Sequence, residues 1–157
     1  MQKIVTFLVF NDQAEEAVNL YVSVFKNAKI KNLVRMGGEV PGTPANFVHA
    51  TFEIEGQEFQ AINGGPHFSF TEGISLFVNC DTQEELDELW EKLSEGGKEV
   101  QCGWLTDRFG VSWQIVPTVL GKLMGDKDRV KAGRVMQALL QMKKLDIATL
   151  QKAYEGE

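Results

Sequence analysis

The chain has 157 residues, of which 43% are hydrophobic and 24% are charged. These values are typical of a globular protein and exclude a largely disordered one, and the length suits one domain with an ordinary core. The net charge of −6 disfavours nucleic acid as a partner, because binding a polyanion usually needs a basic face. We expect no signal peptide, no membrane-crossing segment and no membrane partner, and hence a cytoplasmic protein.

The first 63 residues are predicted to form one strand, one helix and three more strands. Ile4–Phe10 is rich in Val, Ile and Phe, which favours a strand. Asn11 or Asp12 is expected to cap the helix that follows. Apolar residues three and four positions apart mark its buried face, namely Ala14, Ala17, Val18, Tyr21, Val24 and Phe25. The later strands are predicted over residues 28–36, 47–54 and 57–63. Glu55–Gly56 forms the tight turn between the last two.

The same order of elements starts again at residue 74. Ile74–Cys80 predicts a strand, and Thr82 with Glu85 three residues later forms a capping box. The helix that follows is expected to bury Leu86, Leu89, Trp90 and Leu93, and Gly96–Gly97 ends it. Three short strands are then predicted over residues 98–102, 103–107 and 111–117.

The two halves correspond residue by residue, which indicates an internal duplication. At an offset of 70 positions, the matching pairs are Ile4 and Ile74, Phe7 and Phe77, Gln13 and Gln83, and Glu15 and Glu85. At an offset of 54, they are Gly56 and Gly110, Phe59 and Trp113, Gln60 and Gln114, and Ile62 and Val116. Each match alone is weak, but they follow one another in the order of the elements. We therefore predict an α+β fold made of two βαβββ modules.

Residues 118–157 match neither half and are expected to be helical. The apolar residues at helical spacing are Val130, Met136, Leu139 and Leu140. Asp146 is placed to cap a last helix that buries Leu150 and Tyr154. This tail is expected either to pack on the outside of a sheet or to complete a dimer. The single domain is thus organised as module one at 1–63, a connector at 64–73, module two at 74–117 and a C-terminal helical tail at 118–157.

Three segments resemble a known family. They are "DQAEEAVNLYVSVF" within Phe7–Phe25, "NGGPHFSF" at Asn63–Phe70 and "CGWLTDRFGVSWQIVP" at Cys102–Pro117. They are similar to the PhnB-like proteins of the vicinal-oxygen-chelate superfamily (glyoxalase, bleomycin resistance and dihydroxybiphenyl dioxygenase), a group often labelled 3-demethylubiquinone-9 3-methyltransferase. The resemblance covers nearly the whole chain. It implies that each module forms a curved half-barrel sheet, that the two sheets surround a cleft, and that the protein is a homodimer.

The resemblance also implies one divalent metal, held by the first and last strands of the modules. The glutamate that metal-binding members commonly carry in the last strand is replaced here by Gln114, and the matching strand of the first half offers Gln60. Glutamine lacks the charge that draws a cation out of water. The first strands usually supply histidine, but here they offer only Thr6 and Ser75. We therefore expect neither a metal nor another cofactor.

Gln60 and Gln114 are the main candidates for contact with a ligand. Each lies one position from a large aromatic residue, Phe59 or Trp113, and therefore on the opposite face of its strand. If the aromatic residues pack beneath the helices, the two amides line the concave side and bind a small polar ligand by hydrogen bonds. Ser75 belongs to the same candidate pocket.

Three other side chains complete the candidates. Trp104, beside Gly103 near a turn, is a candidate for the pocket wall. His49 lies in a predicted strand and is either structural or directed toward the ligand. His67 follows two glycines and a proline, where a hydrogen bond that holds the two halves together is favoured over catalysis. No catalytic residue is predicted, because neither Cys80 nor Cys102 has a histidine close in sequence.

Four functions remain open at this stage. We favour a small-molecule-binding protein without a metal, acting as a homodimer. The second is a metal-dependent lyase, isomerase or dioxygenase with an unfamiliar ligand set such as His49, His67 and Glu58. The third, the methyltransferase of the family label, is disfavoured because the first helix follows "FND" without the glycine-rich turn that usually holds a nucleotide-like methyl donor. The fourth is a purely structural or regulatory dimer.

Overall fold

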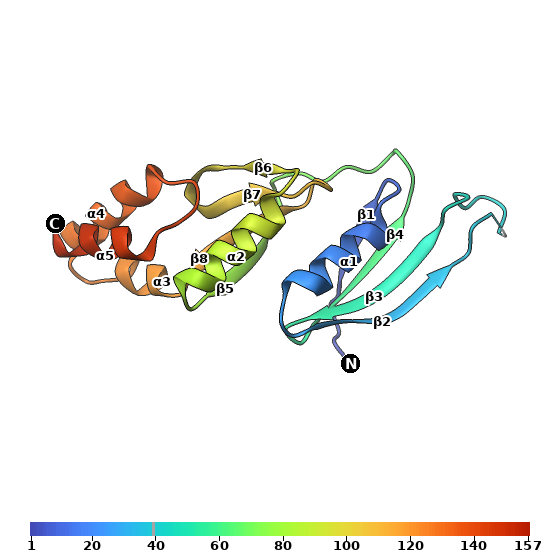
Figure 1. Ribbon diagram of the computed structural model, residues 1–157, viewed down its shortest axis with the longest axis horizontal. Helices are drawn as coiled ribbons and strands as arrows, with labels where there is room; N and C mark the ends of the chain where they lie inside the picture. The colour runs from blue at the N-terminus through green and yellow to red at the C-terminus, as the bar shows by residue number, and fades with distance from the viewer. Residues whose placement is uncertain (39) are drawn as a thin grey trace. The chain divides into compact units, whose positions relative to one another are not determined.

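Each half of the chain builds one four-stranded mixed sheet with a helix on one side (Figure 1). The computed structural model describes residues 1–38 and 40–157, which divide into two units, Met1–Phe70 and Thr71–Glu157. The strand order is β1-β4-β3-β2 in the first sheet and β5-β8-β7-β6 in the second, and neither sheet closes into a barrel. The predicted α+β fold of two βαβββ modules is confirmed.

The first unit contains the elements predicted for module one. They are β1 (Thr6–Phe10), α1 (Ala14–Val24), β2 (Ala28–Arg35), β3 (Val48–Ile54) and β4 (Gln57–Asn63). β1 pairs with β4 in parallel, and the other pairs are antiparallel. Glu55 and Gly56 both have positive φ, 50° and 80°, as a tight hairpin turn requires. Tyr21 of α1 packs against Phe52 of β3, so the helix buries its apolar face on the sheet.

The predicted cap of α1 is wrong. The residue before the helix is Gln13, which makes no side-chain capping bond, and neither Asn11 nor Asp12 takes this position. Instead the backbone N–H of Ala14 donates to Oδ1 of Asn63 at 2.8 Å, and Nδ2 of Asn63 donates to the carbonyl of Asn46 at 2.9 Å. Asn63 is buried at the end of β4. The start of α1 is therefore held by a side chain from the last strand of its own module.

The second unit follows the same plan. Its elements are β5 (Leu76–Cys80), α2 (Gln83–Ser94), β6 (Lys98–Glu99), the short 3₁₀ turn η1 (Gln101–Gly103), β7 (Trp104–Thr106) and β8 (Ser112–Pro117). Thr82 caps α2 as predicted, because its Oγ1 accepts from the N–H of Glu85 at 3.2 Å, but the return bond of the predicted capping box goes to the residue before the cap. The carboxylate of Glu85 in turn accepts from the N–H of Asp81 at 3.1 Å.

The strand predicted over 98–102 is wrong in its second part. Residues Gln101–Gly103 form η1 instead, with positive φ at Cys102 (63°) and Gly103 (85°). The N–H groups of these two residues donate to the carbonyls of Met142 and Lys143 at 2.8 Å each. The backbone here bonds to the C-terminal tail rather than to a neighbouring strand.

The internal duplication extends to the register of the strands. In the first sheet Phe7 of β1 lies opposite Gln60 of β4. In the second sheet Phe77 of β5 lies opposite Gln114 of β8. The two offsets found in the sequence therefore bring the same two residue types together in both halves.

The tail forms three helices within the second unit, α3 (Val119–Met124), α4 (Arg129–Leu140) and α5 (Ile147–Glu155). Oδ1 of Asp146 accepts from the N–H of Thr149 at 2.8 Å and caps α5, and Leu150 is buried, as predicted. Tyr154, which was also expected to be buried, is only half-buried. Gln83 of α2 joins the tail through bonds to the backbone of Leu145 and Ile147. The buried residues of α4 are Ala132 and Val135, whereas Val130, Met136 and Leu140 are exposed. None of the helices in the described part of the chain could span a membrane.

Asp107 holds the turn between β7 and β8. Its side chain is 2% exposed. Oδ1 accepts from the N–H groups of Phe109 and Val111 at 2.9 and 3.0 Å, and Oδ2 accepts from Nε1 of Trp113 at 2.9 Å. A single buried carboxylate thus closes the turn and orients the buried indole of Trp113.

The variant Asp107→Asn tests this role. The amide nitrogen cannot accept a hydrogen bond, so one of the three donors loses its partner in a buried place. We expect the free energy of unfolding to fall by about 2–3 kcal/mol in urea titrations followed by circular dichroism. The exposed Glu91→Gln is the control and should stay within about 0.5 kcal/mol of the native protein. Equal midpoints for the native protein and Asp107→Asn would contradict the role assigned to Asp107.

Candidate functional site

The helix-free face of each sheet carries the two glutamines. Successive side chains of a strand point to opposite faces. Phe59 and Trp113 are buried on the helix side, at 7% and 2% exposure. Gln60 and Gln114, one position further along, are half-buried on the other side. The structure therefore places both amides on the face that no helix of their own unit covers.

In the first unit Gln60 belongs to a small polar and aromatic cluster. Nε2 of His49 lies 3.0 Å from Oε1 of Gln60. Because Oε1 can only accept, Nε2 carries the hydrogen in this bond. The ring of Phe7 stacks on His49 with 6.3 Å between centroids and 23° between planes, and Phe7 remains 49% exposed. His49 therefore faces the candidate ligand surface rather than the core.

In the second unit Gln114 has the equivalent position with different partners. Its Nε2 donates to Oγ of Ser75 at 2.9 Å. Phe77 on one neighbouring strand and Trp104 on the other lie directly opposite Gln114 in register. Phe77 is 53% exposed. The amide is thus placed between two aromatic residues, with one hydroxyl beside it.

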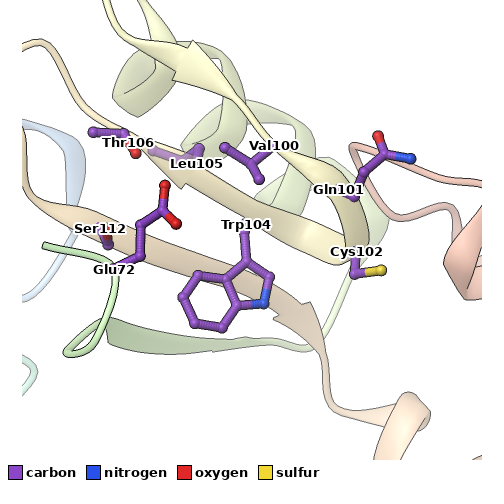
Figure 2. Close-up of a pocket in the computed structure, with 8 residues that line it drawn as sticks. All are labelled: Glu72, Val100, Gln101, Cys102, Trp104, Leu105, Thr106 and Ser112. Atoms are coloured by element: carbon purple, nitrogen blue, oxygen red, sulfur yellow. The ribbon is translucent and has the colours of Figure 1, made fainter.

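A pocket of about 370 Å³ lies next to Trp104 in the second unit (Figure 2). Residues around it include Glu72, Val100, Cys102, Trp104, Thr106 and Ser112. Trp104, a candidate for a pocket wall from the sequence, is among the residues that line this pocket. Glu72, Thr106 and Ser112 were not predicted. Thr106 and Ser112 pair across β7 and β8, whereas Glu72 comes from the segment before β5. No local motif marks Glu72, since only the fold brings it beside the indole.

His67 does not join either cluster. It is exposed in the segment that follows β4, and its side chain makes no hydrogen bond within the described residues of its own unit. A bond from His67 that holds the two halves together stays a prediction. His67 is thus a surface residue of the first unit.

The side chains near the glutamines do not fit the divalent metal that the superfamily implies. The side chain bonded to Gln60 that could ligate a metal is one imidazole, and the side chain bonded to Gln114 is one hydroxyl. No group of three His, Cys, Asp or Glu side chains in residues 1–38 and 40–157 is placed to hold a metal ion. The set His49, His67 and Glu58 is not such a group, and Glu58 instead pairs with Nζ of Lys31 at 2.8 Å. We therefore derive no step that passes through a metal.

A second depression, of about 430 Å³, lies at the start of α1 in the first unit. Its lining includes the acids Asp12, Glu15 and Glu16. The Arg35 guanidinium lowers the pKa of Glu15 through a hydrogen bond and its charge. Acidic residues at this end of a helix are explained by its dipole, which stabilises negative charge there. These acids are part of the helix start.

The chain is similar to one family along most of its length. The family model for 3-demethylubiquinone-9 3-methyltransferase matches residues 2–116. The solved PhnB protein of Bacillus cereus is 40% identical, with a TM-score of 0.69 over 74% of this chain and 100% of its own. The chain belongs to this family. It is a PhnB-like protein of the vicinal-oxygen-chelate superfamily, as its motifs suggested.

Two further solved structures share the fold of this PhnB-like chain. PA1353 from Pseudomonas aeruginosa is 25% identical, with a TM-score of 0.60 over 74% of this chain and 98% of its own. The fosfomycin resistance protein FosX from Listeria monocytogenes is 16% identical, with a TM-score of 0.52 over 72% of this chain and 91% of its own. At that identity the likeness to FosX concerns the fold alone. No curated protein matches the chain.

The two cysteines of this protein differ in their surroundings. Cys80 is buried, and burial raises the pKa of its thiol to about 12, with a smaller contribution from the charges of Glu85 and Asp81. Cys102 is half-buried and lines the pocket beside Trp104. Since the thiolate is the reactive form, Cys80 is an inert structural residue.

Alkylation of the native protein tests this difference. With iodoacetamide at pH 8 we expect Cys102 to be modified while Cys80 remains unmodified, as read by peptide mass spectrometry. In the variant Cys102→Ser, the folded protein should take up almost no label, and label on Cys80 should appear on unfolding in urea. Rapid labelling of Cys80 in the folded variant would show that its thiol is not buried.

Proposed function

We propose that this PhnB-like protein binds a small organic molecule on the helix-free faces of its sheets, without a metal ion. The observation that carries the proposal is the pair of repeat-related amides, Gln60 and Gln114. Each faces away from the helices and lies opposite a phenylalanine, Phe7 or Phe77, that stays about half exposed. The same combination of groups thus recurs in both halves of a duplicated fold.

These groups are suited to binding through hydrogen bonds and stacking. A glutamine amide has two donor hydrogens and an accepting oxygen with two lone pairs. The bonds to His49 and Ser75 use only part of this capacity, so each amide retains groups that can bind a ligand. Ligand sites are mostly apolar and aromatic with a few well-placed polar groups, which describes these surfaces.

A metal-dependent reaction is the alternative that the superfamily implies. A variant of FosX from Listeria monocytogenes was solved with Mn(II) and 1S,2S-dihydroxypropylphosphonic acid, at 15% identity to this chain. The fold can therefore hold a metal and a small polar molecule in that protein. In the present chain an uncharged amide lies at each of the two repeat-related positions, and hard cations prefer charged oxygen ligands. The donor set thus favours direct binding of an organic ligand.

The methyltransferase of the family label has less support in this fold. A nucleotide-like methyl donor usually binds a doubly wound parallel sheet at a glycine-rich turn between a strand and a helix. Here the strand order of both sheets places one parallel pair beside antiparallel pairs. The turn from β1 to α1 contains Asn11, Asp12 and Gln13 and no glycine.

Calorimetric titration of tag-free protein with Zn²⁺, Ni²⁺, Mn²⁺ and Fe²⁺ tests the metal-free part of the proposal. We expect no stoichiometric tight binding, because the amides supply no charge to replace the hydration shell. Gln114→Glu is the matched variant and should bind divalent ions more tightly than the native protein does. Tight binding by the native protein at one ion per chain would refute the proposal that no metal is needed. Assays of lyase, isomerase and dioxygenase activity would then follow.

A fragment screen by NMR in the presence of EDTA tests the binding surface. We expect shifts to concentrate on the helix-free faces, at residues such as His49, Gln60, Phe77 and Gln114. For a fragment that contacts Gln114, the variant Gln114→Ala should weaken binding about threefold to tenfold, the value of one hydrogen bond. Gln151→Ala, an exposed position on α5, should leave it unchanged. Shifts confined to the helices would place any ligand elsewhere and overturn the proposal.

A further inference from the structure

The charge in the lining of the pocket beside Trp104 is negative. Its charged side chain is Glu72, and the described lining contains no lysine or arginine. The remaining groups are an indole, an amide, a thiol, two hydroxyls and aliphatic side chains. A ligand that enters this pocket meets one carboxylate with no protein cation beside it. The chain as a whole also carries a net charge of −6.

Trp104 differs from the other two tryptophans. Trp90 and Trp113 are buried, at 3% and 2% exposure, and their indole N–H groups donate to the carboxylates of Glu99 and Asp107. Trp104 is only half-buried, and its ring lies in the pocket on the same side of the strands as the Glu72 carboxylate (Figure 2). The face of an indole attracts cations more strongly than any other aromatic side chain.

We infer that this pocket binds a small organic cation, an ammonium or quaternary ammonium group that contacts the Trp104 ring and the Glu72 carboxylate. The inference rests on the proposed function and narrows its ligand class for the second unit. Val100 supplies an aliphatic contact for the apolar part of such a ligand. A volume of about 370 Å³ has room for a small amine.

Other ligand classes fit the lining less well. An anion would approach the Glu72 carboxylate without a neutralising lysine or arginine among the lining residues. A neutral apolar molecule could stack on the indole but would gain nothing from Glu72. The charge of the ligand is therefore the property that separates these possibilities.

A pair of probes that differ in charge alone makes the test. Choline and 3,3-dimethyl-1-butanol have the same shape, with a quaternary nitrogen in one and a carbon in the other. We expect choline to change the tryptophan fluorescence and to bind about tenfold or more tightly than the alcohol, since an added cation–π contact and an ion pair favour it. Its affinity should fall as salt is raised. Equal affinities for the two probes would overturn the inference.

Variants of two lining residues test whether choline binds in this pocket. Trp104→Leu should weaken choline binding about threefold to thirtyfold, and Glu72→Gln about twofold to fivefold because the carboxylate is exposed. Glu91→Gln makes the same change of net charge on the exposed side of α2 and should leave the affinity unchanged. Urea midpoints equal to that of the native protein show that the variants are folded. Choline binding that Trp104→Leu and Glu72→Gln leave intact would place the cation elsewhere and refute the inference.

The remaining outcomes separate this inference from the proposed function. If both probes bind equally and Trp104→Leu weakens both, the pocket is a binding site for neutral molecules, so the cation is wrong and the proposed function stands. If neither choline nor the larger benzyltrimethylammonium binds, the inference fails. The NMR fragment screen on the helix-free faces then decides the proposed function independently.

Discussion

The candidate binding surfaces depend on the parallel pairing of the first and last strands of each module. Parallel neighbours cannot be joined by a tight turn, so the chain leaves β1 through α1, and β5 through α2, before it returns. These helices cover one face of each sheet and leave the other without a helix from the same unit (Figure 1). The register of the same pairing places Phe7 opposite Gln60 and Phe77 opposite Gln114 on the uncovered faces. One constraint thus separates the core from the candidate binding surface in both halves.

The duplication keeps this arrangement but changes the partners of the two amides. In the first half Gln60 bonds to an imidazole, and in the second half Gln114 bonds to a hydroxyl and lies opposite an indole. The residue at the end of the last strand differs as well. In the first module Asn63 accepts a hydrogen bond from the start of α1. In the second module Pro117 has the equivalent position and no side-chain acceptor. The core positions stay apolar in both halves, as the buried pair Phe59 and Trp113 shows. The polar groups have diverged, so the two faces offer different chemistry on one backbone.

The sequence predicted what local patterns encode. Alternating apolar residues gave β4 as Gln57–Asn63, and the spacing of Thr82 and Glu85 gave the start of α2, because each signal lies within a few residues. It missed features that depend on contacts between distant segments. The cap of α1 is a side chain 49 residues away, and η1 forms where the backbone of Cys102 meets Met142. The candidate site also combines local and long-range features. The alternation of side chains along the strands predicted the faces of Gln60 and Gln114. Glu72 and Trp104, in contrast, line one pocket only because the fold brings their segments together.

The C-terminal tail stabilises one wall of the pocket, although the family model ends at residue 116, before the tail begins. The N–H groups of Cys102 and Gly103 donate to carbonyls of the tail, and Cys102 lines the pocket next to Trp104. Gly103 has φ of 85°, and a Cβ there would lie about 3.0 Å from Leu145 of the tail. Glycine therefore lets the tail approach closely enough to hold the backbone in this turn. The segment between α4 and α5 thus holds the backbone just before Trp104, and this wall of the pocket depends on residues that lie beyond the part of the chain matched by the family model.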